Sequence, residues 1–250
     1  MHVRQAANVL ELLEYFARRL RPATLAEIAD DLGWPRSSTF NLVGTLAERG
    51  FLYEPGERRA YYPSPRWLAL AQATAAAEPL PPAVHDLAAE VAHETGETTA
   101  IGACAGAHAC LLEVVESTQA VRFFARIGDR IPIHASSVGR ALLAQYDRGE
   151  RQALYHKLRF ERYSDTTPAG AAEVEAELEA AAGRGWHQSD CEYLPDLAGV
   201  SLPLPVPQRK LAIVVAGPVS RCLQRRPQTA ATIRDAIERL RLQLETTADS

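Results

Sequence analysis

The stretch GDRIPIHASSVGRALLAQ, near the middle of the chain, gathers side chains with recognisable chemistry. Ser136 or Ser137 could act as a nucleophile, because His134 stands close by as a potential base. Asp129 or Asp190 could orient that histidine. The same stretch could instead be a binding wall, since a helix that begins at a serine offers hydroxyl and free backbone N–H groups to a ligand. The stretch alone leaves both interpretations open.

The rest of the sequence offers little support for an enzyme. It contains no G-x-S-x-G elbow of the kind that exposes a nucleophilic serine. It also lacks a glycine-rich phosphate loop and a suggestive pair of carboxylates. We expect a protein that is not an enzyme, with a Ser/His hydrolase as an alternative.

The four cysteines do not form a recognisable metal or redox motif. Cys104, Cys110, Cys191 and Cys222 include no CxxC pair, and they are too sparse for a disulfide scaffold. His108 lies near Cys110, but no spacing supplies two further metal ligands. We expect reduced thiols, no metal and no cofactor, with a redox-responsive DNA-binding protein as another alternative.

The composition is that of a water-soluble globular protein. Hydrophobic residues make up 47% of the 250 positions, and no apolar run is long enough to span a membrane. The amphipathic N-terminus, which carries Glu11 and Glu14, lacks the features of a signal peptide. These properties predict a cytoplasmic protein without membrane contact. The net charge of −4 is unevenly spread, since residues 1–77 carry 9 basic and 8 acidic side chains.

The N-terminal third predicts three helices followed by a hairpin. Apolar residues recur at helical spacing over 8–20. Thr24 followed by Glu27 forms a capping-box pattern before a helix over 25–32, which ends at Gly33. Pro35 suits the first turn of a third helix, ending at Gly50.

After Gly50 the hydrophobic period changes from helical to alternating. Residues 51–55 and 59–63 are short β-type runs around a turn at Pro55-Gly56. Three helices and a hairpin in this order predict a winged helix-turn-helix over residues 1–64.

The remaining chain predicts a linker helix over 65–80 and an α/β domain over 81–250. The overall fold class is therefore α+β, and we expect an antiparallel sheet with helices on its faces. Strands are expected at 98–104, 110–116, 120–127, 186–193, 199–206 and 211–216. Helices are expected at 83–95, 138–145, 149–158, 171–183 and 227–245.

The third helix is the candidate recognition helix. Helical spacing points Phe40, Val43, Leu46 and Ala47 at the core. Asn41 could bond adenine at two points, while basic and hydroxyl side chains suit phosphates and base edges. The candidate DNA contacts are Thr24, Arg36, Ser37, Ser38, Thr39, Asn41, Thr45, Arg58 and Arg59.

At this point the chain resembles the IclR-type bacterial transcriptional regulators over nearly its full length. TLAEIADDLGWPRSSTFNLVGTLAERGFL resembles the family's helix-turn-helix, and RIGDRIPIHASSVGRALLA its most characteristic internal pattern. DCEYLPDLAGVSLPL and VAGPVSR resemble two later segments. The resemblance implies a GAF-like effector-binding domain and dimers or dimers of dimers. It also implies palindromic double-stranded operator DNA near catabolic genes, and more often repression than activation.

The resemblance also places an effector pocket at the start of the helix after PIH, where backbone N–H groups could hold a carboxylate. We take Ser137 as an N-cap of that helix. A histidine at the position of His134 more often has a structural role than a direct contact with the ligand. The candidate effector-binding residues are His134, Ala135, Ser136, Ser137, Ser189, Tyr193, Asp196, Gly199, Ser201, Val214 and Ala216.

Several of these positions depart from the family pattern. The family often has an acid at Ser189 and cysteines at Ala135 and Gly199, and it has serines at Val214 and Ala216. Polar groups are therefore lost and apolar surface or space is gained. Since burying a small polar acid without partners is costly, this pattern predicts a larger, more apolar effector such as an aromatic acid.

Two further departures concern the recognition helix and a loop. The family usually has an arginine at Asn41, so base or phosphate contact there should differ from that of typical members. It usually has glycine at Asp196, which predicts a changed path for the loop at 194–199.

Overall fold

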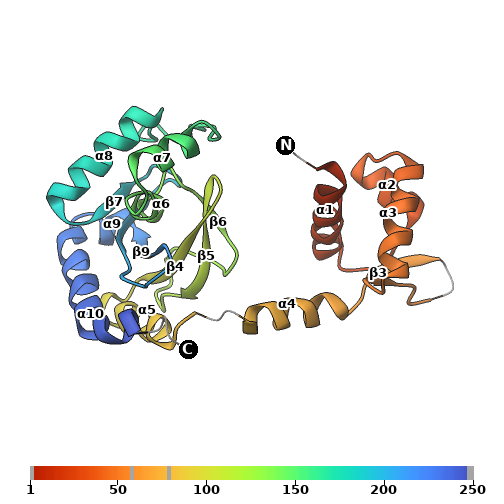
Figure 1. The fold of residues 1–250 in the computed structure, drawn as a ribbon, viewed down its shortest axis with the longest axis horizontal. Coiled ribbons are helices and arrows are strands. Elements are labelled where there is room, and N and C mark those ends of the chain that lie inside the picture. The colour runs from red at the N-terminus through yellow and green to blue at the C-terminus, as the bar shows by residue number, and fades with distance from the viewer. Residues whose placement is uncertain (1–2, 57–58, 78–79, 247–250) are drawn as a thin grey trace. The chain divides into compact units, whose positions relative to one another are not determined.

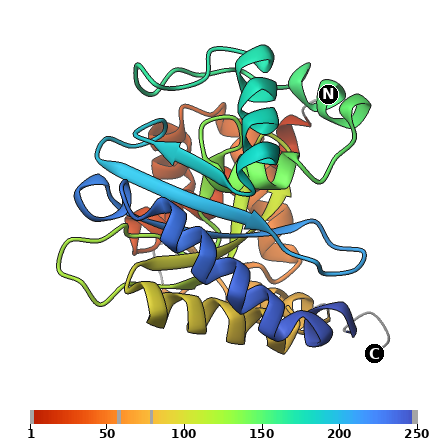
Figure 2. The same ribbon diagram turned by 90° about the vertical axis from the view of Figure 1, so that its left-hand side faces the viewer.

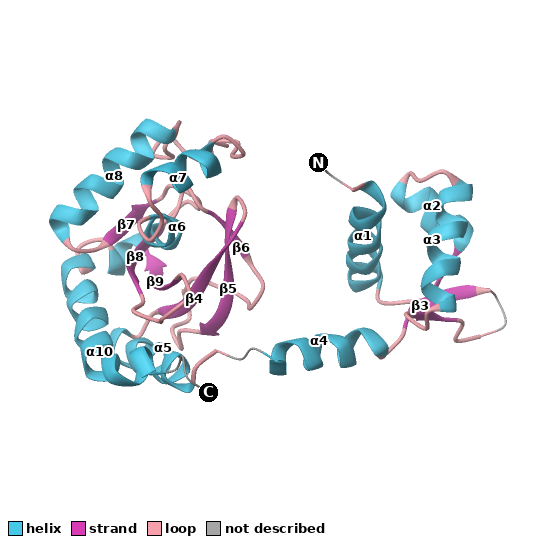
Figure 3. Ribbon diagram, viewed as in Figure 1, coloured by secondary structure: helices cyan, strands magenta, loops and turns pink. Residues whose placement is uncertain are grey.

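The computed structural model describes residues 3–56, 59–77 and 80–246. The chain divides into two compact units, Met1–Pro79 and Leu80–Ser250 (Figure 1). Both contain helices and antiparallel strands, so the predicted α+β class is confirmed (Figure 3). Within the described ranges, no helix is long and apolar enough to cross a membrane.

The first unit is a helix-turn-helix with a small sheet. Its three strands pair antiparallel in the order β1-β3-β2, with Ala23 opposite Tyr61 and Tyr53 opposite Tyr62. The elements are α1 (Arg4–Arg19), β1 (Ala23–Thr24), α2 (Leu25–Leu32), α3 (Arg36–Glu48), β2 (Leu52–Tyr53), β3 (Ala60–Pro63) and α4 (Arg66–Ala77).

Local sequence determines the ends of α2. The Thr24 hydroxyl accepts from the Glu27 backbone N–H at 3.3 Å, and the Glu27 carboxylate accepts from the Thr24 N–H at 2.8 Å. This is the predicted capping box. Gly33 ends the helix with φ at +64°, a left-handed conformation that glycine adopts without steric cost.

Helix α3 faces the core differently from our prediction. Val43 and Leu46 are buried as expected, but Phe40 is 64% exposed and Thr39 is fully buried. Thr39, Val43 and Leu46 stand four and three residues apart, so they form one helical stripe that leaves Phe40 beside it. Pro35 is the N-cap of α3 and not part of its first turn.

The second unit is built on a six-stranded antiparallel sheet in the order β6-β5-β4-β9-β8-β7. Its strands are β4 (Thr98–Ala105), β5 (His108–Val115), β6 (Arg130–Pro132), β7 (His187–Asp190), β8 (Leu197–Pro203) and β9 (Leu211–Pro218). Its helices are α5 (Pro82–Thr95), α6 (Ser137–Leu143), α7 (Arg148–Tyr155), α8 (Ala171–Arg184), α9 (Val219–Cys222) and α10 (Arg226–Thr246).

Strand alternation sends neighbouring residues to opposite faces of this sheet. Ile213 and Val215 pack with α5 and α10, which lie side by side on one face (Figures 1 and 2). Val214 and Ala216 pack with α6 on the other face. Helices α7 and α8 lie on that second side, where Tyr155 and the α8 side chains join a smaller cluster.

The strand predicted at 120–127 is wrong. That segment has no strand pairing, and Val121, Phe124 and Ile127 are exposed. The partner of β5 on this side is instead the short strand β6, preceded by Gly128 at a φ of +90°. Residue type favours a strand here, but a strand also needs backbone partners, and β6 already occupies that edge of β5.

We predict that Gly139→Ala destabilises the second unit severely. A Cβ on Gly139 would lie 2.1 Å from the Ile133 carbonyl oxygen, so α6 would have to move off the backbone beneath it. The expected loss in the free energy of unfolding is about 3 kcal/mol or more, measured by urea denaturation.

Gly183→Ala in α8 is the matched control. A Cβ there meets nothing within 4 Å, so stability should stay unchanged or rise by up to about 1 kcal/mol. Equal effects of the two substitutions would contradict the close packing of α6.

Candidate nucleic-acid interface and ligand pocket

Helix α3 presents a polar surface to solvent. Arg36, Ser37, Ser38, Asn41 and Thr45 are all exposed. Ser38, Asn41 and Thr45 also border a surface groove between α3 and the first turns of α1. Such a surface at the N-terminal part of the second helix of a helix-turn-helix is suited to the major groove.

Two of the candidate threonines have structural roles. Thr39 is fully buried, and its hydroxyl donates to the Pro35 carbonyl at 3.2 Å, so its prediction as a DNA contact is wrong. The Thr24 hydroxyl is engaged in the capping box of α2. The exposed Thr45 donates to the Asn41 carbonyl at 2.7 Å, which leaves its oxygen lone pairs available as acceptors.

Of the two candidate arginines in the wing, the segment between β2 and β3, the structure describes Arg59. Arg59 is exposed, with φ at +49°, immediately before β3. Arg58 lies outside the described residues. The exposed guanidinium of Arg59 suits a phosphate or the minor groove.

The second unit contains a pocket between the start of α6, strands β8 and β9, and the loops after β5 and β7. Eight of the predicted effector residues line it: Ala135, Ser136, Ser137, Ser189, Tyr193, Gly199, Val214 and Ala216. The sequence analysis missed the other lining residues: Leu111, Phe123, Ile131, Val138, Glu192, Leu194 and Leu197. These come mostly from strands and loops whose positions depend on sheet pairing.

The free space inside the pocket, which is partly open to solvent, is small, about 30 Å³. This is room for about two water molecules, whereas sites for drug-sized ligands span roughly 300–1,000 Å³. The space as it stands is therefore smaller than a ring-sized ligand.

Three serine hydroxyls gather around Gly199. Ser201 donates to the Ser137 hydroxyl at 2.9 Å. A Cβ on Gly199 would lie 2.7 Å from the Ser137 hydroxyl oxygen and 2.8 Å from that of Ser189. The absent side chain at Gly199 thus makes space for the Ser137 and Ser189 hydroxyls to converge. Ser201 is fully buried and lies behind the pocket wall.

The cap of α6 is Ser136 and not Ser137. Its hydroxyl accepts from the Gly139 N–H at 3.2 Å and donates to the Pro132 carbonyl at 2.7 Å. Ser137 is the first helical residue, and its side chain turns toward Ser201. The helix begins one residue earlier than expected, so the Ser136 hydroxyl is used in the cap and the Ser137 hydroxyl bonds Ser201 instead.

His134 lies away from the pocket, so direct ligand contact is not supported. It is 2% exposed, and its Nε2 lies 3.0 Å from the Glu161 carbonyl. Among the hydrogen bonds of the described residues, none joins His134 to Ser136 or Ser137. A serine nucleophile needs such a bond to its base, so the hydrolase interpretation lacks its geometry.

Asp196 also lies outside the pocket wall. Its φ is +58°, in the left-handed region, which glycine favours and aspartate tolerates. Asp196 meets that conformational demand while its carbonyl accepts from the Val219 N–H at 2.8 Å.

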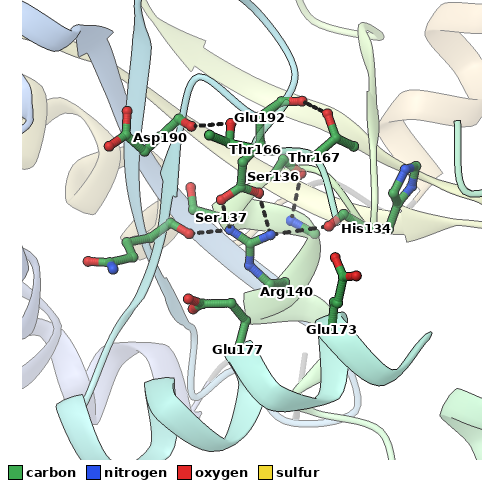
Figure 4. Close-up of polar contacts among 12 residues, drawn as sticks. His134, Ser136, Ser137, Arg140, Thr166, Thr167, Glu173, Glu177, Asp190 and Glu192 are labelled. Atoms are coloured by element: carbon green, nitrogen blue, oxygen red, sulfur yellow. Dashed lines mark hydrogen bonds and ion pairs between the residues drawn. The ribbon is translucent and has the colours of Figure 1, made fainter. Parts of the chain in front are cut away.

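An ion pair beside the pocket was not anticipated. Arg140 is fully buried, and its guanidinium donates to both carboxylate oxygens of Glu192, at 2.5 and 2.9 Å (Figure 4). It also donates to the carbonyls of Gln188 and His134. Removing one partner of such a buried pair typically costs about 3–5 kcal/mol. The one signal in the sequence is a charged residue inside the apolar segment SVGRALL.

The environments of Cys191 and Cys222 disfavour redox chemistry. Burial raises the pKa of Cys222 to about 12, and the nearby Glu97 carboxylate acts in the same direction. Burial also raises the pKa of Cys191. Both shifts suppress the thiolate, which is the reactive form. All four cysteines are free thiols.

His187, at the start of β7, is buried beside the Arg140 network. Burial, and then the positive charges of Arg140 and Arg184, lower its pKa to about 4. Its Nδ1 has no hydrogen-bond partner among the described residues. The folded protein therefore keeps this imidazole neutral at neutral pH.

We predict that His187 makes stability fall in mild acid. The unfolded chain takes up a proton near pH 6.5, while the folded chain resists until about pH 4. Stability is therefore fully present above pH 6.5 and declines toward pH 4, by up to about 3 kcal/mol. Urea denaturation across this range should show a flatter profile for His187→Gln, with the exposed His156→Gln as control. Identical profiles for the wild type and His187→Gln would contradict the assignment.

Comparison with known proteins places both units in one family. Residues 5–56 match the IclR helix-turn-helix domain, and residues 75–241 match the bacterial transcriptional regulator IclR C-terminal domain. The transcriptional repressor IclR of Escherichia coli strain K12 is 26% identical over 223 residues, covering 88% of this chain and 81% of the relative.

Solved structures show the same fold. The Thermotoga maritima IclR has a TM-score of 0.73 at 17% identity, covering 97% of this chain and 99% of that one. An IclR homolog from Microbacterium hydrocarbonoxydans, solved in complex with 4-hydroxybenzoate, has a TM-score of 0.73 at 20% identity and covers 96% and 98%. The chain therefore belongs to the IclR family of bacterial transcriptional regulators, and it is a helix-turn-helix regulator of transcription rather than an enzyme.

Proposed function

We propose that the protein is a repressor that leaves its operator when an organic acid with an aromatic or apolar body binds the second unit. The observation that carries this proposal is the composition of the pocket. Apolar side chains form most of its wall, and the hydroxyls of Ser137 and Ser189 converge beside Gly199. Such a pocket suits a ring with one polar end.

The departures from the family pattern support the same ligand class. Val214 and Ala216, where the family has serines, lie on the α6 face of the sheet and line the pocket. Ala135 lines it as well. Together they give a ring an apolar wall, so the ring itself would gain from leaving water. The homolog from Microbacterium hydrocarbonoxydans, which was solved with 4-hydroxybenzoate, supports an aromatic acid by analogy.

We propose that DNA recognition uses α3 and the wing. Asn41 takes a base edge, Arg36, Ser37 and Ser38 take phosphates or bases, and Arg59 takes the backbone or the minor groove. The regulator works as a dimer or a dimer of dimers on a palindromic operator near a catabolic operon. Effector binding changes the spacing of two recognition helices through the linker helix α4, and a preference of a few kcal/mol for one state is enough.

The effector is tested by calorimetry and DNA binding together. Benzoate and 4-hydroxybenzoate should bind the full-length protein and release it from an operator selected from random-sequence duplexes, followed by fluorescence anisotropy. Glyoxylate and pyruvate should bind at least about tenfold more weakly, because they leave the apolar wall unfilled. Tight binding of glyoxylate or pyruvate, with none for the aromatic acids, would overturn the proposal.

Phe40 is expected to add apolar contact with a thymine methyl group. It is exposed on the same face of α3 as Ser37 and Asn41. Phenylalanine is among the side chains that contact this methyl group in the major groove. Phe40→Ala should weaken operator binding by about 1 kcal/mol, roughly fivefold in Kd.

Operators with deoxyuridine in place of thymine provide the control, since they lack only the methyl group. At one thymine position, the replacement should weaken binding of the wild type as much as Phe40→Ala does. The same replacement should not weaken binding of the Phe40→Ala variant any further. If Phe40→Ala and the loss of the methyl group weakened binding additively at every thymine position, Phe40 would not contact a thymine methyl group.

A further inference from the structure

The Arg140–Glu192 ion pair connects the pocket to the buried body of the second unit. Glu192 lines the pocket, and its carboxylate is held at both oxygens by Arg140, which is fully buried beneath it (Figure 4). Glu192 is the one formally charged side chain among the described residues that line the pocket. The pocket therefore contains a negative charge that is matched from behind by a guanidinium.

This arrangement opposes the entry of an acid while the pair is intact. A carboxylate in the pocket would face the Glu192 carboxylate, and like charges at close range repel. Both terminal nitrogens of Arg140 already donate to Glu192, and two backbone carbonyls accept from them as well. An acid therefore binds favourably only if Glu192 moves away.

Glu192 belongs to a loop that covers the pocket. Tyr193 and Leu194 of the same loop line the pocket. The Thr167 hydroxyl donates to the Glu192 carbonyl at 2.6 Å, and the Cys191 N–H donates to the Leu197 carbonyl at 2.9 Å. The ion pair of the Glu192 side chain with Arg140 is therefore a further anchor of the loop, beside these backbone bonds.

We propose that Glu192 occupies the position of the effector's carboxylate, and that binding exchanges one carboxylate for the other on Arg140. Arg140 keeps a bidentate carboxylate partner throughout, so the buried guanidinium is never left unpaired. Glu192 moves into water, and loop 191–196 is released to accommodate the ligand. This inference rests on the proposed function, since it names the group that the aromatic acid would engage.

The exchange is tested with benzoate and its uncharged analogue benzamide on the full-length protein. Glu192→Gln removes the competing charge but keeps a side chain that can accept from Arg140. By calorimetry, it should strengthen benzoate binding about tenfold or more and change benzamide binding by no more than about twofold. The benzoate-to-benzamide preference should therefore rise.

Thr167→Val is the matched control. It removes a tether of the same loop and leaves the carboxylate in place, so benzoate and benzamide affinities should shift together. A measurement on the wild type tests the exchange even if a variant fails to fold. Saturating benzoate should speed hydrogen exchange over residues 191–196, and benzamide should not.

The exchange is overturned if Glu192→Gln weakens benzoate binding or leaves the preference unchanged. It is also overturned if benzoate slows exchange over residues 191–196, or if neither the wild type nor Glu192→Gln binds benzoate. If benzoate and benzamide bound the wild type equally, the carboxylate exchange would be excluded. The proposal of an apolar effector pocket would still stand. Operator release by 4-hydroxybenzoate, measured separately, decides the proposed function.

Discussion

The close packing of α6 against the backbone at Ile133 is the constraint on which the ligand-binding unit depends. Every residue from Ser137 to Leu143 is buried, and Gly139 allows the helix to approach the Ile133 carbonyl as no larger residue could. This single contact sets the position of the Ser136 cap, the Ser137 hydroxyl and the Arg140 guanidinium at once. Because a helix is rigid over two turns, the polar and apolar parts of the pocket are positioned together.

Burial of Arg140 imposes a second constraint, on charge. A guanidinium does not lose its proton in a protein, so it must be paired when it is removed from water. Glu192 provides that pairing from a loop, while the carbonyls of Gln188 and His134 satisfy further N–H groups. The same positive charge, together with burial, holds the pKa of His187 low. Pocket, loop and neighbouring strand are thereby linked through one buried side chain.

The sheet separates the residues that line the pocket from those that pack on its opposite face. Strand alternation directs Val214 and Ala216 toward α6, while their neighbours Ile213 and Val215 pack with α5 and α10. Residue changes on one face can therefore alter which ligand the pocket prefers, while packing on the other face continues to stabilise the fold. Glycine at 199 leaves room beside the strand for the Ser137 and Ser189 hydroxyls, which a larger side chain would displace.

Residue types and spacing predicted most of the local elements, and the family resemblance predicted eight of the residues that line the pocket. The capping box at Thr24 and the stop at Gly33 depend on interactions within a few residues, and strands β8 and β9 on short, nearly continuous apolar runs. The tertiary structure alone decided that Thr39 is buried and Phe40 exposed, and that 120–127 forms no strand. It also brought Arg140 to Glu192, 52 residues further along the chain. These outcomes depend on which distant segments pack together, because residue type and periodicity specify a segment's preference but not its partner.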